Sequence, residues 1–181
     1  MDTSKKDKIR KTLHETKDRR SSMTCKVIEC KVDISALSQK TTDSLNQLFL
    51  ECKWFYNSLI ASENINGYDT KVTNVQVKVL DKFEDRQLTV LSSQMKQGIK
   101  SRTFSSLMTL STLKSDGRKV GALKFKSEIK SIPLKQHNNT FTIFKSSKRI
   151  KIQGIKQLTL KRERCSITKL LMLMDVKSIC V

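Results

Sequence analysis

The fold class is decided by residues 121–161, GALKFKSEIKSIPLKQHNNTFTIFKSSKRIKIQGIKQLTLK. Apolar side chains alternate with polar ones through much of this stretch, which is the two-residue period of strands with one buried face. The pairs Asn138-Asn139 and Ser146-Ser147 are typical turn residues. The pattern therefore predicts a series of short strands, at residues 123–125, 140–144, 149–152 and 158–160.

Upstream of this stretch the sequence predicts one strand and then helices. Residues 28–34 alternate apolar and charged side chains, as a half-buried strand does. Residues 45–60 repeat apolar side chains every three or four positions, which predicts an amphipathic helix capped by Thr41 or Thr42. A second helical tract is predicted from Phe83 to Leu113, ending at the breaker 115–117. The order strand, helices, strands predicts an α+β fold.

The charge of the chain is strongly positive and unevenly placed. There are 36 Lys and Arg against 17 Asp and Glu, a net charge of +19. Residues 114–164 hold 15 basic and 3 acidic side chains, whereas residues 36–113 are nearly balanced. A basic surface repels itself unless phosphates displace its counterions, so we expect nucleic-acid binding, with a merely soluble basic surface as the alternative. The basic residues on polar positions of the predicted strands are Lys124, Lys126, Arg149, Lys151 and Lys161.

The sequence lacks the motifs of several classes of protein. The longest apolar run, at 170–174, is far shorter than the roughly 20 residues of a membrane span, and no signal peptide is expected. The five cysteines include no CxxC pair, which favours reduced thiols and a cytoplasmic location. No phosphate-binding loop, metal-ligand motif or nucleophile motif occurs, so no cofactor and no catalytic residue are expected.

The end of the first predicted helix is rich in aromatic residues. Tyr56 lies on the apolar stripe, so packing is its expected role. Trp54 and Asn57 lie off that stripe, where they can stack on a base or hydrogen-bond to one. Gln94 lies beside the apolar face of the second helix, and is either simply solvated or a reader of adenine.

Four segments, taken together, point to a family. They are LNQLFLECKWFYNSLI (45–60), LSSQMKQGIKSRTFSSLMTL (91–110), GRKVGALKFKS (117–127) and SIPLKQHNNTFTIFKSSKRIKIQGI (131–155). This set resembles the N-terminal part of TnpB, the OrfB-type transposon proteins related to miniature type V CRISPR effectors. In that family a small wedge barrel of strands carries an inserted recognition bundle of helices.

The resemblance implies a domain layout for this chain. A barrel-like wedge sheet would be formed by residues 25–35 and 118–164, with a helical recognition subdomain inserted at residues 36–117. Residues 1–24 are expected to be a basic arm that orders on nucleic acid, or else a solvated tail. Residues 165–181 form a C-terminal tail of different, Met-rich composition.

The resemblance also implies partners and site residues. In the family, the wedge and recognition parts grip a guide RNA and its target DNA and read a short flanking motif. Tyr56, Asn57 and Gln94 match positions near the duplex that carries this motif. The basic stretch near the heteroduplex is matched by Lys119, Lys124 and Lys126, with Arg118 adjoining them.

The chain departs from the family at its C-terminal end. Complete members continue into a nuclease domain with three carboxylates and a zinc ribbon, whereas Asp175 is the only acid after Arg164 here. One carboxylate cannot assemble a two-metal site, so a truncated member that binds guide RNA and DNA without cleaving them is expected. The alternatives are one half of a split RNA-guided nuclease, or an unrelated small basic RNA-binding protein.

Overall fold

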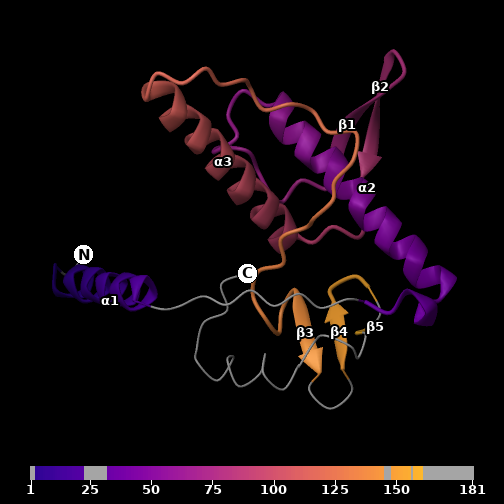
Figure 1. Ribbon diagram of the computed structural model, residues 1–181, viewed down its shortest axis with the longest axis horizontal. Helices are drawn as coiled ribbons and strands as arrows, with labels where there is room; N and C mark the ends of the chain where they lie inside the picture. The colour runs from indigo at the N-terminus through magenta and orange to yellow at the C-terminus, as the bar shows by residue number, and fades with distance from the viewer. Residues whose placement is uncertain (1–2, 23–31, 145–147, 156, 161–181) are drawn as a thin grey trace. The chain divides into compact units, whose positions relative to one another are not determined.

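The computed structural model describes residues 3–22, 32–144, 148–155 and 157–160 (Figure 1). By their contacts, the described residues up to Ser22 form one unit and those from Val32 onward form another. In the first unit, helix α1 (Thr3–Ser21) has its two large apolar residues, Ile9 and Leu13, exposed. A basic arm without an apolar period was predicted here, and the described side chains of this helix form no buried apolar face.

Helix α2 (Gln39–Ala61) confirms the helix predicted from the stripe at 45–60. Its N-cap is Ser38, whose hydroxyl accepts a hydrogen bond from the Thr41 N–H at 3.3 Å, so the predicted cap at Thr41 or Thr42 was wrong. The buried face is rotated slightly from the predicted stripe, because Phe55 is fully buried while Phe49 is 36% exposed. This face packs against β1 and α3.

Residues 74–87 form a β-hairpin in place of the start of the second helix. Strand β1 (Asn74–Val79) pairs antiparallel with β2 (Lys82–Gln87) across a two-residue turn. The helix predicted from Phe83 was therefore wrong at its start, since α3 (Ser93–Ser115) begins after the cap residue Ser92. The side chains of β2 are all exposed, so β2 has no apolar period that would indicate a strand. The alternation in β1 and the tight turn determine the conformation of β2.

The C-terminal end of α3 confirms the predicted stop at residues 115–117. Gly117 has a φ of +78°, in the left-handed region that glycine adopts without steric cost. Its N–H donates to the Lys114 carbonyl at 3.1 Å, and the Arg118 N–H donates to the Leu113 carbonyl at 3.0 Å. This pair of bonds is a Schellman motif, which satisfies carbonyls that the helix end leaves open.

Residues 118–135 return along the two helices without entering a sheet (Figure 1). The strand predicted at 123–125 was therefore wrong. Its apolar residues do not share a buried face: Phe125 is 65% exposed, whereas Ile129 further on is buried. Gly98 of α3 allows the segment to approach closely, because a Cβ at Gly98 would lie 3.1 Å from the Pro133 ring.

The last described strands confirm the prediction for residues 140–160. They are β3 (Phe141–Phe144), β4 (Arg149–Ile152) and β5 (Leu158–Thr159), antiparallel in the order β3-β4-β5. Val32 forms an antiparallel bridge with Leu160, and the 3₁₀ turn η1 (Ile34–Ala36) follows at once. The strand predicted at 28–34 was therefore wrong at its end, because Asp33 caps η1 and Ile34 begins it, with 76% of Ile34 exposed. Residues 28–31 of that prediction, and the tail 165–181, lie outside the described residues.

One hydrophobic core links the helices to the second sheet. Leu158 and Ile155 belong to the same buried cluster as Leu48 of α2 and Met95 and Ile99 of α3. The α+β class is confirmed, with helices and two small antiparallel sheets; the strands of the described ranges do not close a barrel. In those same ranges, no helix has the length and apolar character needed to cross a membrane.

Candidate nucleic-acid interface

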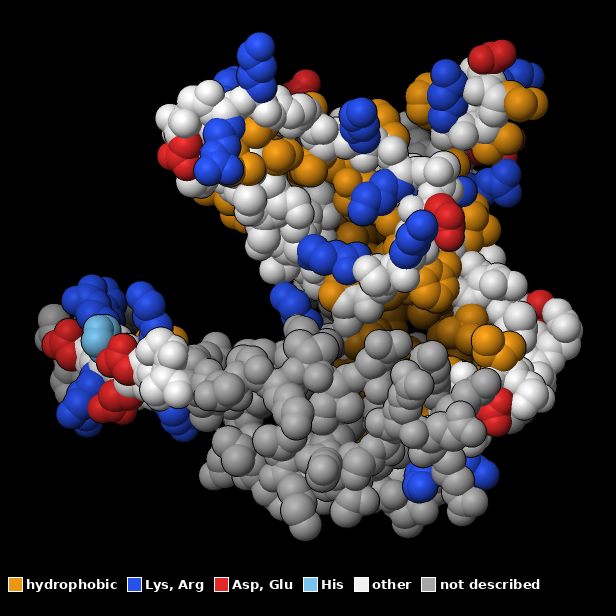
Figure 2. Space-filling model, in the orientation of Figure 1, with side chains coloured by type: hydrophobic (Ala, Val, Ile, Leu, Met, Phe, Trp, Pro, Cys, Tyr) orange, Lys and Arg blue, Asp and Glu red, His pale blue; other side chains and the backbone are white. Residues whose placement is uncertain are grey.

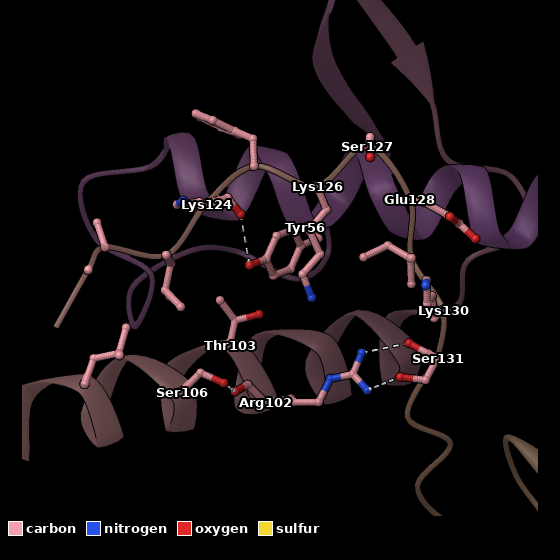
Figure 3. A pocket seen from close by; sticks show the side chains of 16 residues that line it. Tyr56, Arg102, Thr103, Ser106, Lys124, Lys126, Ser127, Glu128, Lys130 and Ser131 are labelled. Atoms are coloured by element: carbon pink, nitrogen blue, oxygen red, sulfur yellow. Dashed lines mark hydrogen bonds between the residues drawn. The ribbon is translucent and has the colours of Figure 1, made fainter. Parts of the chain in front are cut away.

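A groove runs between α3 and the returning segment 121–131, with Tyr56 of α2 at its base (Figure 3). Its volume is about 910 Å³. We call it the basic groove, because four of the five charged side chains that line it are cationic: Arg102, Lys124, Lys126 and Lys130, against Glu128. Among the described residues no carboxylate lies within ion-pair distance of these cations. Their charge is therefore available to a ligand.

The groove continues past the C-terminal end of α3. An adjoining concavity of about 620 Å³ shares Leu110 and residues 121–123 with the basic groove. It adds the cationic side chains Lys114, Arg118 and Lys119. The structure thus brings Arg118, Lys119, Lys124 and Lys126, which the sequence singled out, onto one continuous basic track. Lys and Arg side chains also outnumber Asp and Glu on the face shown in Figure 2.

Tyr56 lines the base of the groove and contacts two of its lysines. It is 7% exposed, and its hydroxyl donates a hydrogen bond to the Lys124 carbonyl at 3.4 Å. The Lys126 ammonium lies 4.5 Å from the centre of the Tyr56 ring, a cation–π contact. Burial raises the pKa of Tyr56, with Arg102 opposing the shift, so the phenol stays neutral. These contacts agree with the packing role expected from the apolar stripe.

Asn57 clamps the backbone of the segment. Its side-chain nitrogen donates to the Lys126 carbonyl at 3.0 Å, and its side-chain oxygen accepts from the Lys126 N–H at 2.9 Å. One donor and one acceptor of the carboxamide are thereby used. The contacts seen make Asn57 a residue that positions Lys126; its hydrogen bond to a base stays a prediction.

Arg102 fixes the other end of the segment. Its guanidinium donates to the Ser131 carbonyl at 2.8 Å and to the Ser131 hydroxyl at 3.0 Å (Figure 3). Sequence reasoning missed this residue. A signal existed, since Arg102 follows Met95 and Ile99 by seven and three positions and so lies near the buried side of α3. The segment that it meets could not be inferred from that spacing.

A buried carboxylate, Glu51, holds the start of α3 against α2. It is fully buried and accepts five hydrogen bonds between 2.8 and 3.0 Å, from the Gln47 side chain, the Thr89 N–H and hydroxyl, and the N–H groups of Val90 and Leu91. Burial by itself would raise the pKa of Glu51, but these hydrogen bonds outweigh it and the pKa lies below its ordinary value. Sequence reasoning missed this residue too.

Two lysines of α3 serve the fold. Lys96, 4% exposed, donates to the Val72 carbonyl at 2.6 Å, and burial lowers its pKa against the opposing effect of Glu51. Lys100 donates to the Tyr68 carbonyl at 2.8 Å. Both tie α3 to the loop before the hairpin, so they add nothing to the basic track.

The other predicted site residues lie away from the groove. Gln94, in the first turn of α3, does not line it, and its buried side-chain oxygen has no hydrogen-bond partner among the described residues. Arg149 and Lys151 lie on the exposed face of β4. The sequence predicted one polar sheet face shared with Lys124 and Lys126; this was wrong, because residues 121–127 are not in a sheet. Lys161 lies outside the described residues.

The described residues contain no group of three or more His, Cys, Asp or Glu side chains placed to hold a metal ion. What the groove offers a ligand is the ammonium groups of a segment clamped at Lys126 and Ser131, together with the Arg102 guanidinium of α3. No protein-family model, curated protein or solved structure matches this chain.

Proposed function

We propose that the chain binds nucleic acid, with the phosphate backbone lying in the basic groove. The observation that carries the proposal is the fixed row of cations on residues 118–130, which have no carboxylate partner. Lysines that neutralise phosphates release the counterions condensed on the nucleic acid, and this release drives binding without regard to sequence. Packing them so closely costs stability in the absence of a polyanion.

The resemblance to TnpB gives the proposal its finer form. The bound nucleic acid is a guide RNA with its target DNA, and residues 36–117 act as the recognition insertion of a wedge-like β domain. The finding that Tyr56 and Asn57 position Lys124 and Lys126 supports this form, because it joins two members of each matched set in one site; Gln94 is not among them. The proposal is for binding alone, without cleavage.

The test compares two triple variants of equal charge change. Replacing Lys124, Lys126 and Lys130 with Gln removes cations of the groove, whereas replacing Lys40, Lys71 and Lys82 with Gln removes exposed cations elsewhere. Affinity for a fluorescent 20-nucleotide RNA is measured by anisotropy over a range of salt concentrations. We expect the groove variant to bind more weakly and its log–log salt slope to fall by about 2, at roughly 0.7 per phosphate contact.

Equal effects of the two triple variants would contradict the proposed groove. A second arm of the experiment separates the finer form from a general RNA-binding protein. The full chain is offered a transcript of a transposon end and an unrelated RNA of the same length. Preference for the transposon transcript supports the guide-RNA form, whereas equal affinity favours the unrelated small basic RNA-binding protein.

A further inference from the structure

A second concavity beside the basic groove combines exposed aromatic rings with lysines. Its volume is about 630 Å³, and it is formed by α2, the β1–β2 hairpin and the returning segment. We call it the aromatic pocket, after Trp54, Phe83 and Phe125, which line it together with Lys53, Lys78 and Lys126. No acidic side chain lines it. Sequence reasoning singled out only Trp54 as a stacking residue.

Two of the three aromatic rings of this pocket are open to solvent. Phe83 is 69% exposed and Phe125 is 65% exposed, although both belong to a unit with a well-formed core. Exposed phenylalanines gathered in one concavity indicate a binding surface more often than singly scattered apolar residues do. The rings therefore offer flat apolar faces to a ligand.

The lysines around these rings decide the kind of ligand. An apolar peptide gains nothing from three ammonium groups, whereas a nucleotide has both a flat base for the rings and a phosphate for the lysines. The two concavities also adjoin one another, since Phe125 and Lys126 line both. A strand whose phosphates follow the basic groove can turn a base into the aromatic pocket there.

We propose that the aromatic pocket holds one or more unpaired bases of the nucleic acid that lies in the basic groove. This inference rests on the proposed function and adds to it a requirement for single-stranded character. Bases in a duplex are already stacked and paired, so they cannot enter the pocket without being turned out of the helix. The pocket therefore selects a single-stranded stretch or a junction.

The test uses the full chain and its only tryptophan, Trp54, which lines the pocket. A 12-nucleotide oligouridylate and a 12-base-pair RNA duplex are titrated separately, and Trp54 fluorescence and affinity are recorded. We expect the single strand to quench Trp54, and the duplex to bind through the groove with less quenching. Phe83→Leu keeps an apolar side chain but removes the ring, and should weaken single-strand binding about five- to 100-fold while duplex binding is unchanged.

The control variant is Leu80→Ala, at an exposed apolar position of the same hairpin that does not line the pocket. It should change neither affinity. The inference is overturned if Phe83→Leu leaves single-strand binding intact while the groove lysine variant still weakens it, or if Phe83→Leu weakens both ligands equally. It is also overturned if an acidic peptide, and not the RNA, quenches Trp54. Failure of the wild-type chain to bind either RNA defeats the proposed function itself.

Discussion

Asn57 and Lys126, 69 positions apart in the sequence, are joined by two hydrogen bonds that use both the N–H and the C=O of Lys126. In a sheet these groups would be paired by a neighbouring strand. Here one side chain of α2 takes the place of that strand. The lysines of the basic groove are therefore positioned by a helix.

Replacing Asn57 with Ala should loosen the segment. Both hydrogen bonds to Lys126 are lost, and because the site is partly exposed the free energy of unfolding should fall by about 1 to 2 kcal/mol. RNA affinity should fall as well, since Lys124 and Lys126 are no longer held in place. Urea denaturation and fluorescence anisotropy measure the two effects. Unchanged affinity in a folded Asn57→Ala variant would show that the clamp does not matter for binding.

Replacing Glu51 with Gln should destabilise the protein at neutral pH. The amide NH₂ of Gln faces N–H donors that the carboxylate accepted, so we expect a loss of about 2 to 3 kcal/mol in the free energy of unfolding. Gln47→Ala serves as the control, because it removes the one side-chain amide that donates to Glu51 and leaves the backbone N–H groups with their acceptor. Equal small losses in the two variants would contradict this role of Glu51.

The contribution of Glu51 should depend on pH. Its pKa in the folded protein lies below the ordinary value of 4.5, so the unfolded chain takes up the proton first as the pH falls. The stability that the carboxylate provides is thus complete above about pH 4.5 and is lost as the pH falls through the lowered value. Urea titrations of wild type and Glu51→Gln at several pH values should show the gap in stability narrowing toward acid. A gap that widens in acid would refute the assigned shift.

The Cys52 thiol should be inert in the folded protein. It is fully buried on α2, and burial raises its pKa to about 12, so almost no thiolate is present at pH 8. A variant in which the other four cysteines are Ser isolates it. Its reaction with an aromatic disulfide reagent should be at least about 100-fold slower in buffer than in urea. Rapid labelling in buffer would mean that this part of the core opens readily.

Replacing Leu80 with Gly should stabilise the hairpin. Leu80 has a φ of +53° in the turn between β1 and β2, which is sterically unfavourable for a residue with a Cβ. Its side chain is 90% exposed, so packing does little to offset this cost. We expect Leu80→Gly to be more stable than Leu80→Ala by about 0.5 to 1 kcal/mol, because Ala keeps the steric cost. Thermal or urea denaturation of the pair provides the comparison. The reverse order would argue against a strained turn.

The sequence predicted those parts of the fold in which local pattern and tertiary role agree. Each of three patterns is compatible with a single local structure. They are the apolar stripe of α2, the alternation at 140–152 and the glycine that ends α3. The strand prediction at residues 121–127 failed because a two-residue apolar period does not show whether a second strand is there to pair with. At Phe83 the period was too weak to separate a strand from a helix start.

The candidate site was predictable only in its charge. The surplus of Lys and Arg at 114–164 pointed to Lys124 and Lys126, since charge is visible without any knowledge of the fold, and the resemblance to TnpB added Lys119. Arg102 and Phe83 escaped because their roles depend on which distant segment lies beside them. Tertiary packing determines which segments lie side by side, and the spacing of residues along one helix or strand does not reveal it.

The two attachments of the returning segment divide it into parts with different tolerance to changes in length. Residues 127–130 span the interval between the Asn57 clamp on Lys126 and the Arg102 clamp on Ser131. An insertion or deletion there would force one clamp open. Gly121 lies before both clamps, and an added Cβ there would meet no atom within 4 Å. Natural length variation among homologous chains should therefore gather around residues 119–122, where an insertion opens neither clamp.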